Sequence, residues 1–451
     1  MSKMMAAAFC LVAPAAAQQA GSVTPEEAPS ISLQHCTLAA GCQTEEASLV
    51  LDANWRWVHN KEGYENCFDE NGWHPGYCPD PATCKQNCAV EGIDKAGYAS
   101  TYGVHEEPNG VKLDFMTDGG NVGSRLYVTD GADSYKMFKL LNKEFTIDVD
   151  TSTLYCGMNG AAYFIEMDAK GGQGQDGNAA GAKFGTGYCD AQCPHEKFDP
   201  DENNGICCVE MDIWEANREA AAYTPHPCST VGPTKCQGID CGYVVDEANS
   251  TGDERWKGLC DKDGCDFNNY RMGAHGFYGP GKEVDSTIPM TVVTQFITDD
   301  QTDTGKLVEI RRIYVQNGKV IANADSKIQN VTGNTMTDEF CNAQKETFGD
   351  YDHHQEKGGL QSMGEALKRG MVLSLSIWDD YSTHMGWLDA HFPKDKEISD
   401  PGALRGPCDG STSHPEHVRE HHKDSFVTYS NIKYGEIGST FAAERRMDVL
   451  I

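Results

Sequence analysis

Three acidic residues lie close together in the segment CCVEMDIWEAN, which spans residues 207–217. They are Glu210, Asp212 and Glu215, and most of their neighbours are apolar. Carboxylates that converge repel one another, which raises the pKa of one group and lowers that of another. The spacing therefore suggests a site that holds a protonated acid and an anion side by side at one pH.

The alternation of residues in this segment predicts a β-strand. One face would lie in the core and carry Val209, Met211 and Ile213. Glu210, Asp212 and Trp214 would share the opposite face. Strict alternation would turn Glu215 inward, where an unpaired carboxylate is costly. We therefore expect a bulge or kink between Ile213 and Glu215 that brings the three acids together.

Paired carboxylates of this kind suit glycoside cleavage. Cleavage with retention needs an ionised nucleophile and a protonated acid whose carboxyl groups lie roughly 5–5.5 Å apart. Glu210 and Glu215, at opposite ends of a short bent strand, could meet that distance. Asp212 could hydrogen-bond the nucleophile and set its orientation and charge. A calcium site or an acidic surface strand are alternatives that the pattern leaves open.

The elements around this strand predict an all-β protein. The chain has 451 residues, of which 39% are apolar, so it can bury a large core. Long helical patterns are scarce, and the best helix candidate is LQSMGEALKRG at 360–370. Short apolar or alternating runs occur at 145–150, 161–168, 290–298, 309–316, 372–380 and 425–434. We expect one large antiparallel sandwich with long loops, and find no linker or separate small module.

The N-terminus and the cysteines indicate an exported protein. Lys3 precedes a short apolar run, which predicts a signal peptide over residues 1–17 with cleavage after Ala17. One of the 19 cysteines lies in that segment, and the even remainder suits nine disulfides. The alternative is a zinc site formed by Cys189, Cys193, Cys207 and Cys208. No later segment is long and apolar enough for a membrane helix.

The formal net charge of −31 narrows the possible partners. Nucleic acid and anionic lipid would both be repelled, so binding of either is not expected to be the main function. The partner should be neutral or cationic, and we expect the protein to be a monomer.

Several segments together carry a resemblance to a known family. CCVEMDIWEAN followed by TPHPCSTVG closely resembles the active-site strand of glycoside hydrolase family 7, the retaining cellulases of the cellobiohydrolase I type. The similarity covers essentially the whole mature chain, residues 18–451. Further segments resemble the same family: LDANWRWVH, YASTYGV, GTGYCDAQCP, CDKDGCDFNNYRMG, FYGPG, IWDDYSTHMGWLD, PGALRGPC and YSNIKYGEIGST.

The resemblance implies a role for each residue of the site. Glu210 would be the nucleophile, Glu215 the general acid and then base, and Asp212 the partner of the nucleophile, while His226 and Asp190 would line the same site. The implied fold is the concanavalin-like β-sandwich, and neither a metal nor another cofactor is needed for the chemistry. Tryptophans would stack on the faces of the sugar units: Trp57 at the tunnel entrance, Trp55 deeper inside, and Trp378 and Trp387 flanking the cleavage point. The residues implied to hydrogen-bond the sugar hydroxyls are Arg125, Tyr163, Gln192, Arg255, Asp263, Arg271 and Arg405.

The resemblance also implies a pairing that uses every mature cysteine. The family often has a tenth bridge, but Ala89 stands at one of its positions and the N-terminal partner is missing. The implied pairs are Cys36–Cys42, Cys67–Cys88, Cys78–Cys84, Cys156–Cys408, Cys189–Cys208, Cys193–Cys207, Cys228–Cys260, Cys236–Cys241 and Cys265–Cys341.

The loops bear on whether the chain encloses its substrate in a tunnel or leaves an open cleft. The segment 242–265 keeps a loop that open-cleft family members lack, which favours a reducing-end cellobiohydrolase. Only 13 residues separate Cys193 from Cys207, and Ser382 stands where a second tyrosine often occurs. These two features favour a partly open roof, with internal attack as in an endo-acting cellulase.

Other features admit different interpretations. A β-1,3-glucanase would share the Glu-x-Asp-x-x-Glu pattern, and a glucan-binding lectin would share the sandwich, although a lectin would tolerate loss of the acids. Asn249 and Asn330 stand in N-x-S/T sequons and are candidate glycosylation sites. Four histidines in HPEHVREHH could bind a metal, but we expect a solvated polar loop there: His414, His417, His421 and His422.

Overall fold

The computed structural model describes residues 19–441, except residues 70, 132, 176, 196–203, 245–249 and 251. The predicted signal peptide and Asn249 lie outside the described residues. The strands are β1 (Gln19–Ala20), β2 (Ser30–Thr37), β3 (Gly41–Leu51), β4 (Val58–Asn60), β5 (Phe68–Asp69), β6 (Gly72–Trp73), β7 (Cys88–Val90), β8 (Val104–Glu107), β9 (Gly110–Asp114), β10 (Ser124–Thr129), β11 (Met137–Phe138), β12 (Lys143–Asp150), β13 (Met158–Ile165), β14 (Asn204–Cys207), β15 (Glu210–Ala216), β16 (Ala221–His226), β17 (Thr234–Gln237), β18 (Phe267–Asn268), β19 (Tyr278–Gly279), β20 (Val284–Asp285), β21 (Met290–Thr298), β22 (Leu307–Gln316), β23 (Lys319–Ala322), β24 (Met371–Asp379) and β25 (Phe426–Glu436). The α-helices are α1 (Pro81–Asn87), α2 (Lys95–Ser100), α3 (Asp338–Phe348), α4 (His353–Glu356), α5 (Gly359–Arg369), α6 (Gly386–Asp389) and α7 (Pro415–His421).

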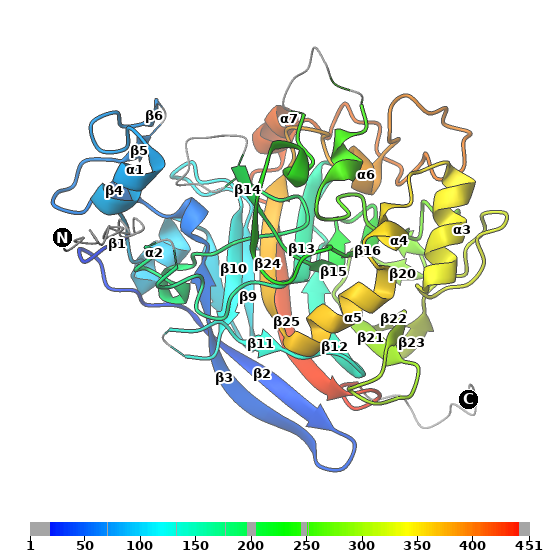
Figure 1. The fold of residues 1–451 in the computed structure, drawn as a ribbon. Helices are drawn as coiled ribbons and strands as arrows, with labels where there is room; N and C mark the ends of the chain where they lie inside the picture. The colour runs from blue at the N-terminus through cyan, green and yellow to red at the C-terminus, as the bar shows by residue number, and fades with distance from the viewer. Residues whose placement is uncertain are drawn as a thin grey trace, which may run out of the picture.

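The predicted all-β sandwich is confirmed. One hydrogen-bonded path runs in the order β18-β16-β15-β13-β24-β10-β3-β2-β25-β12-β21-β22-β23, and it folds over so that its two halves face each other. Neighbouring strands on this path are antiparallel, apart from the parallel pair β2 and β25. Figure 1 shows helices α3, α4 and α5 together beside β20 to β23, away from the small N-terminal sheet of β1, β7 and β4.

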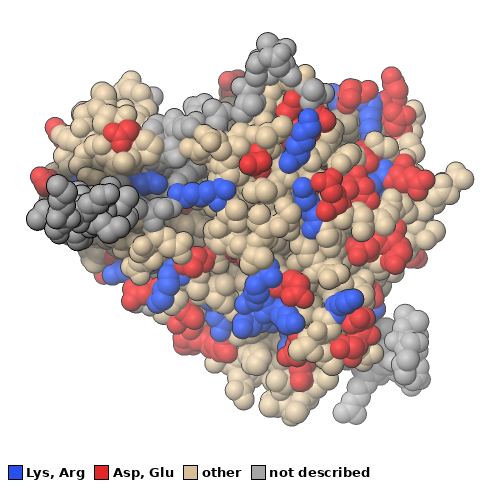
Figure 2. Space-filling view, viewed as in Figure 1, with Lys and Arg blue, Asp and Glu red and all other residues tan. Residues whose placement is uncertain are grey.

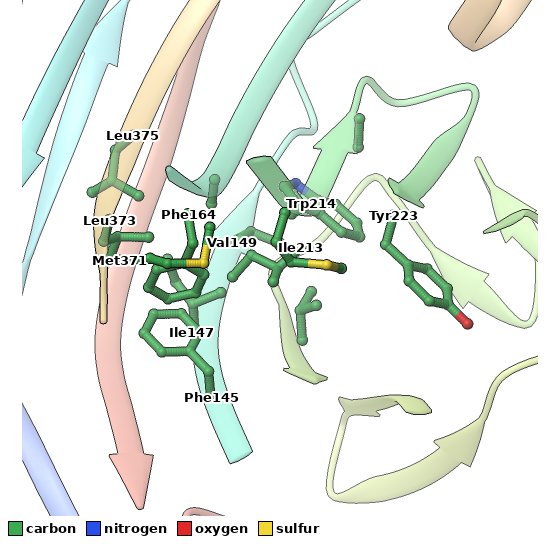
Figure 3. Close-up of a cluster of buried hydrophobic side chains, with 14 of the residues drawn as sticks. Phe145, Ile147, Val149, Phe164, Ile213, Trp214, Tyr223, Met371, Leu373 and Leu375 are labelled. Carbon is green, nitrogen blue, oxygen red and sulfur yellow. The ribbon is translucent and has the colours of Figure 1, made fainter. Parts of the chain in front are cut away.

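The main core lies between the two halves of this path. Phe145, Ile147 and Val149 of β12 point toward Phe164 of β13 and Leu373 of β24 (Figure 3). The rings of Phe145 and Phe164 meet edge to face, with centroids 5.0 Å apart. Because residues on a strand alternate between its faces, packing one face of β13, β15 and β24 into this core presents the other face to the loops.

Phe164→Ala should destabilise the fold strongly. Its ring is fully buried between the two layers, so truncation removes apolar burial and leaves a cavity that costs about 3–5 kcal/mol. Chemical denaturation with the disulfides intact measures the difference in unfolding free energy. Val308→Ala, at a side chain that is 41% exposed on β22, is the matched control and should change it by less than about 0.5 kcal/mol. Equal losses in both variants would contradict this account of the core.

Most of the predicted elements are present. The run 290–298 coincides with β21, and the runs at 145–150, 309–316, 372–380 and 425–434 overlap β12, β22, β24 and β25. The predicted helix at 360–370 is α5, and Gly370 follows it with a φ of 116°. Helix α3 was not predicted.

One loop prediction was wrong. The segment HPEHVREHH forms helix α7 rather than a polar loop. Pro415 occupies the first turn, where its missing N–H costs nothing, and Val418 is fully buried and anchors the helix to the protein. The acidic Glu416 near the N-terminus also suits the helix dipole.

The structure confirms all nine cysteine pairs that the family resemblance implied. The zinc alternative is therefore excluded, because Cys189 and Cys193 are bonded to Cys208 and Cys207. Within the described part of the chain, we find no helix with the length and apolar character needed to cross a bilayer. Figure 2 shows acidic side chains gathered on the side of α3 and α4, in keeping with the high negative charge.

Candidate active site

Four neighbouring strands present polar side chains on the face opposite the core. In one row across the sheet, Arg125 of β10 pairs with Ser376 of β24, which pairs with Ala161 of β13, which in turn pairs with Glu215 of β15. In the next row, Tyr163 of β13 pairs with Asp212. The sheet register therefore places the predicted acids beside polar residues from segments far apart in the sequence.

The predicted bulge in the acidic strand is present. Ala162 pairs with Trp214 and Tyr163 pairs with Asp212, so Ile213 is an extra residue in β15. The pairing with β16 is interrupted over the same stretch, between Asp212 and Glu215. Because the extra residue reverses the alternation, Glu215 returns to the face of the other acids.

The same bulge corrects the prediction for Trp214. The sequence pattern placed its side chain on the carboxylate face, whereas the structure buries it completely in the core. Figure 3 shows the indole beside Ile213 and pointing toward the region of Tyr223. The bulge thus turns an apolar residue inward and an acid outward, which strict alternation could not do.

Glu210 is 8% exposed and is held by the neighbouring loop. Its Oε2 accepts a hydrogen bond of 3.0 Å from the backbone N–H of Ala191. Burial is the main cause that raises the pKa of Glu210 well above its usual value, and the negative charges of Asp212 and Asp190 add to it. The hydrogen bond from Ala191 acts in the opposite direction and favours the anion.

A histidine and a main-chain carbonyl organise Asp212. The Nδ1 atom of His226 lies 2.8 Å from the carbonyl oxygen of Asp261, which can only accept, so this nitrogen carries a proton. The other ring nitrogen lies 3.0 Å from Oδ2 of Asp212. A proton must lie between them, on the imidazole or on the carboxyl group, for this contact to be a hydrogen bond. Burial, followed by the charge of Asp190, raises the pKa of Asp212, and a hydrogen bond with Glu210 lowers it.

Glu215 is more exposed than the other two acids. Its Oε1 accepts a hydrogen bond of 2.9 Å from the side-chain amide of Asn159 on β13. Asn159 is fully buried, and its own oxygen accepts from the backbone N–H of Ala216, so the amide is fixed in orientation. Burial and then the charge of Asp212 raise the pKa of Glu215 well above its usual value. Such a group can remain protonated where an ordinary glutamate ionises.

Removing the Asn159 amide should move the pH profile in a defined direction. Its hydrogen bond lowers the pKa of Glu215, so Asn159→Ala should raise that pKa further. The family resemblance implies that Glu215 is the general acid, which must be protonated before substrate binds, so the alkaline limb of kcat/KM should shift to higher pH. Asn334→Ala, which removes an amide hydrogen bond to Asn323 instead, should leave the limb in place. A shift to lower pH in Asn159→Ala would contradict this assignment.

Asp190 lies on the loop that also holds Glu210. Its carboxylate accepts hydrogen bonds from the hydroxyl of Tyr188 at 2.6 Å and from the backbone N–H of Gln192 at 2.7 Å. Its backbone oxygen accepts from Cys193 and Cys208, both of which are cystines, so the loop is tied firmly to β15. The structure thus brings Asp190 and His226 to the three acids, as the prediction required of residues that line the site.

The predicted aromatic residues form two separate groups. Trp378 and Trp387 are both partly buried, and their rings are nearly parallel with centroids 6.3 Å apart. Trp378 pairs with Asn159 in the sheet, which places this pair near Glu215. Trp57 is stacked on His59 at the N-terminal side of the fold and hydrogen-bonds Asn66. Their contacts with sugar remain predictions.

Arg125 links Trp55 to the acidic site. Its guanidinium lies 5.3 Å from the Trp55 ring centroid and 3.3 Å from that of Tyr188. Its Nε donates a 2.7 Å hydrogen bond to the buried carboxylate of Asp52. Tyr163 joins the same group, because its hydroxyl lies 3.2 Å from that of Tyr188. Aromatic faces and fixed hydroxyls therefore continue from Glu210 toward Trp55.

A second polar group adjoins the loop that carries Asp190. Gln192 donates a 2.7 Å hydrogen bond to the carbonyl of Lys262, and Arg255 donates to the same oxygen at 3.0 Å. Arg255 also pairs with Asp263 at 2.6 Å. The side chains of Arg255 and Asp263 are 45% and 35% exposed, so both can still reach solvent or a ligand.

Arg271 and Arg405 surround the buried Asp266. Arg271 is 4% exposed and is committed to protein partners, namely Asp266, Asp350 and the carbonyl of Gly402. Arg405 lies 3.7 Å from Asp266 and donates to the carbonyl of Trp387, so it supports that tryptophan. Burial and the neighbouring Arg271 lower the pKa of Arg405 to about 10. Arg271 therefore helps to hold Asp266 and the neighbouring loops in place. Hydrogen bonding of either arginine to sugar remains a prediction.

Residues that could hold a metal are found at the same acids. One ligand atom from each of Glu210, Asp212 and His226 lies within 4.8 Å of the other two. The contact of 3.0 Å between Asp212 and His226 already pairs two of these atoms with each other. The set therefore suits acid–base chemistry between paired carboxyl groups.

Three residues that support the site were not predicted. Asn159 fixes Glu215, Tyr188 contacts Asp190, and Asp52 anchors Arg125. The motif GTGYCDAQCP contains Tyr188, and LDANWRWVH contains Asp52, so both stood in recognised segments. Asn159 gave no such signal, because its role depends on the pairing of β13 with β15 and not on its neighbours in sequence.

Comparison with known proteins supports the geometry. The sequence pattern of Glycosyl hydrolase family 7 matches residues 20–441. The structure of a cellobiohydrolase of this family from Daphnia pulex is 44% identical, covers 94% of this chain and 100% of its own, and superimposes with a TM-score of 0.88. A cellobiohydrolase from Melanocarpus albomyces, solved with cellotetraose, is 37% identical over 94% of this chain and 99% of its own, with a TM-score of 0.84. Endocellulase EGI from Humicola insolens is 37% identical over 94% of this chain and 100% of its own, with a TM-score of 0.80.

The fold, the acidic strand and these matches define a glycoside hydrolase. The chain belongs to glycosyl hydrolase family 7, a family of cellulases. Its similar structures include both cellobiohydrolases and an endocellulase, so membership alone leaves open how this enzyme attacks a cellulose chain.

Proposed function

We propose that this protein hydrolyses the β-1,4-glucosidic bonds of cellulose with retention of configuration, releasing cellobiose from reducing chain ends. The observation that carries the proposal is the bulged strand β15, which places Glu210, Asp212 and Glu215 on one face in three different environments. Glu210 accepts a hydrogen bond from a backbone N–H, which favours its anion, and lies next to Asp212, while Glu215 has a fixed amide partner. The pKa of all three acids is raised by burial, so the expected lowering of one of them is not found.

The proposed reaction has two steps. In the first, Glu210 attacks the anomeric carbon and Glu215 gives its proton to the departing glycosidic oxygen, which leaves a glycosyl ester on Glu210. In the second, the ionised Glu215 takes a proton from water, and that water cleaves the ester. Asp212 and His226 share a proton beside Glu210, which can offset the charge change on Glu210 as the ester forms and breaks.

The loop at 242–265, which open-cleft family members lack, favours removal of cellobiose from the ends of cellulose chains. The segment from Cys260 to Cys265 is tied to the rest of the protein by disulfides at both ends. Arg255, on the preceding turn, is ion-paired with Asp263, which lies within this segment.

A second candidate is an endo-1,4-β-glucanase of the same family. The short connection between Cys193 and Cys207 and the 58% exposure of Tyr381 favour a partly open roof. Most of that connection, residues 196–203, lies outside the described residues. Turnover of β-1,3-glucan and sugar binding without cleavage are weaker alternatives, since the match to family 7 covers residues 20–441.

Product analysis on two substrates tests the proposal. Crystalline cellulose should yield mostly cellobiose, and carboxymethyl cellulose should lose little viscosity per reducing end formed. Rapid loss of viscosity would instead establish the endo-acting candidate. Turnover of laminarin without turnover of either cellulose would overturn both.

We also propose an exported, monomeric catalytic domain over residues 18–451, after removal of the signal peptide. The nine disulfides support an oxidising compartment. Asn330 is exposed in a turn, as a glycosylation site requires. N-terminal sequencing of protein from the culture medium, and its mass before and after removal of N-glycans, would test these points.

A further inference from the structure

Helix α7 carries a group of histidines that the proposed reaction does not use. His417 and His421 are four residues apart, so they lie on the same face of the helix. Their ring centroids are 4.2 Å apart, and the ring of His422 lies 6.1 Å from that of His417. His417 and His422 are partly exposed and His421 is exposed, so solvent ions can reach the group.

The ring nitrogens of this group are largely uncommitted. Among the described residues, those of His417 and His422 make no hydrogen bond to the protein. Nδ1 of His421 lies 4.0 Å from a carboxylate oxygen of Glu420, which is beyond hydrogen-bonding distance. His422 is stacked on Tyr155 with centroids 4.0 Å apart, which fixes its ring.

We propose that His417 and His421, with His422 as a third ligand, form a surface site for a divalent transition-metal ion such as Zn²⁺. Neutral imidazole nitrogens are preferred ligands of Zn²⁺, Ni²⁺ and Cu²⁺, with bonds of about 2.0–2.1 Å to zinc. Two rings in contact on successive helical turns need only side-chain rotation to bring a nitrogen of each to one ion. The charge of −31 on the chain also favours cations near its surface.

A metal ion at this site would stabilise helix α7, which lies next to the proposed substrate path. Arg419, between the two histidines, donates two hydrogen bonds of 2.6 and 2.8 Å to Asp379. Asp379 follows Trp378 at the end of β24, and the Arg419 guanidinium also lies 4.7 Å from the Tyr381 ring centroid. Figure 1 shows α7 at that end of β24. A metal ion joining two turns of so short a helix would stabilise it and hence this anchor.

Calorimetric titration of the full-length protein with ZnCl₂ at pH 7.5 tests the proposal. His421→Ala is the informative variant, because that ring is exposed and its loss should not impair folding. It should weaken zinc binding roughly tenfold or more, because one of the three proposed ligands is lost. His35→Ala, which removes an exposed histidine on β2, is the matched control and should leave binding unchanged. The group of Glu210, Asp212 and His226 remains intact in both variants.

Two further measurements complete the test. Affinity should fall roughly tenfold or more at pH 5.5, because protons compete with the metal ion for the imidazole nitrogens. Zinc should raise the melting temperature of the natural protein more than that of His421→Ala. No zinc binding by the natural protein, or equal binding in His421→Ala, would overturn the site. Neither result would bear on cellulose hydrolysis, which is assayed without added metal.

Discussion

Replacing Glu210 by Gln should lower kcat on cellulose and on aryl cellobiosides by roughly 10³-fold or more, equivalent to about 4 kcal/mol or more of transition-state stabilisation. The amide has the shape of the carboxylate but cannot form the glycosyl ester. Because the hydrogen bond from Ala191 can still be accepted by the amide oxygen, the loop should keep its position. Binding of a cello-oligosaccharide, measured by calorimetry, should therefore stay within about tenfold of the natural enzyme.

A matched variant separates this effect from a general one. Glu309→Gln changes an acid on β22 that is ion-paired with Arg311, far from β15 in the strand order. It should retain full activity, and both variants should have the natural melting behaviour. Substantial turnover by Glu210→Gln would remove the assigned nucleophile, even if binding were unchanged.

Replacing Glu215 by Gln should have an effect that depends on the leaving group. A sugar hydroxyl is a poor leaving group and needs a proton, so activity on cellulose should fall roughly 10²–10⁴-fold. Dinitrophenolate leaves without a proton, so kcat/KM for dinitrophenyl cellobioside should stay within about tenfold of the natural value. Removal of the ester should then become slow, because the base that activates water is missing.

Added azide provides the control for this second prediction. As a strong anionic nucleophile it needs no base, so it should restore kcat of Glu215→Gln and yield cellobiosyl azide with retained configuration. It should not accelerate the natural enzyme. Equal losses on both substrates without rescue by azide would show that Glu215 is not the acid and base.

The sequence predicted the fold where local pattern and burial agree. The run MTVVTQFIT alternates, is rich in β-branched residues and coincides with β21. The bulge in β15 was predictable for a different reason, because strict alternation would have buried the unpaired Glu215. The same reasoning placed Trp214 wrongly. A bulge reverses the alternation for every residue after it, so Trp214 turns into the core as Glu215 turns out.

Features that depend on contacts between distant parts of the sequence were harder to predict. Helix α7 is held by two buried residues, Pro415 and Val418, and by the contact of Arg419 with Asp379. A polar sequence gives little sign of these contacts. Asn159 becomes important only when β13 pairs with β15. The disulfide pairs were predicted from the family resemblance, because the number of cysteines alone permits many connectivities.

Trapping of the covalent intermediate tests the central claim most directly. A dinitrophenyl 2-deoxy-2-fluoro-cellobioside should inactivate the enzyme. The fluorine slows both formation and removal of the ester, but the activated leaving group speeds formation, so the ester accumulates. Peptide mass spectrometry of the inactivated protein should then find the fluorocellobiosyl group on Glu210. A label on Asp212 or Glu215, or inverted product with no label, would contradict the account.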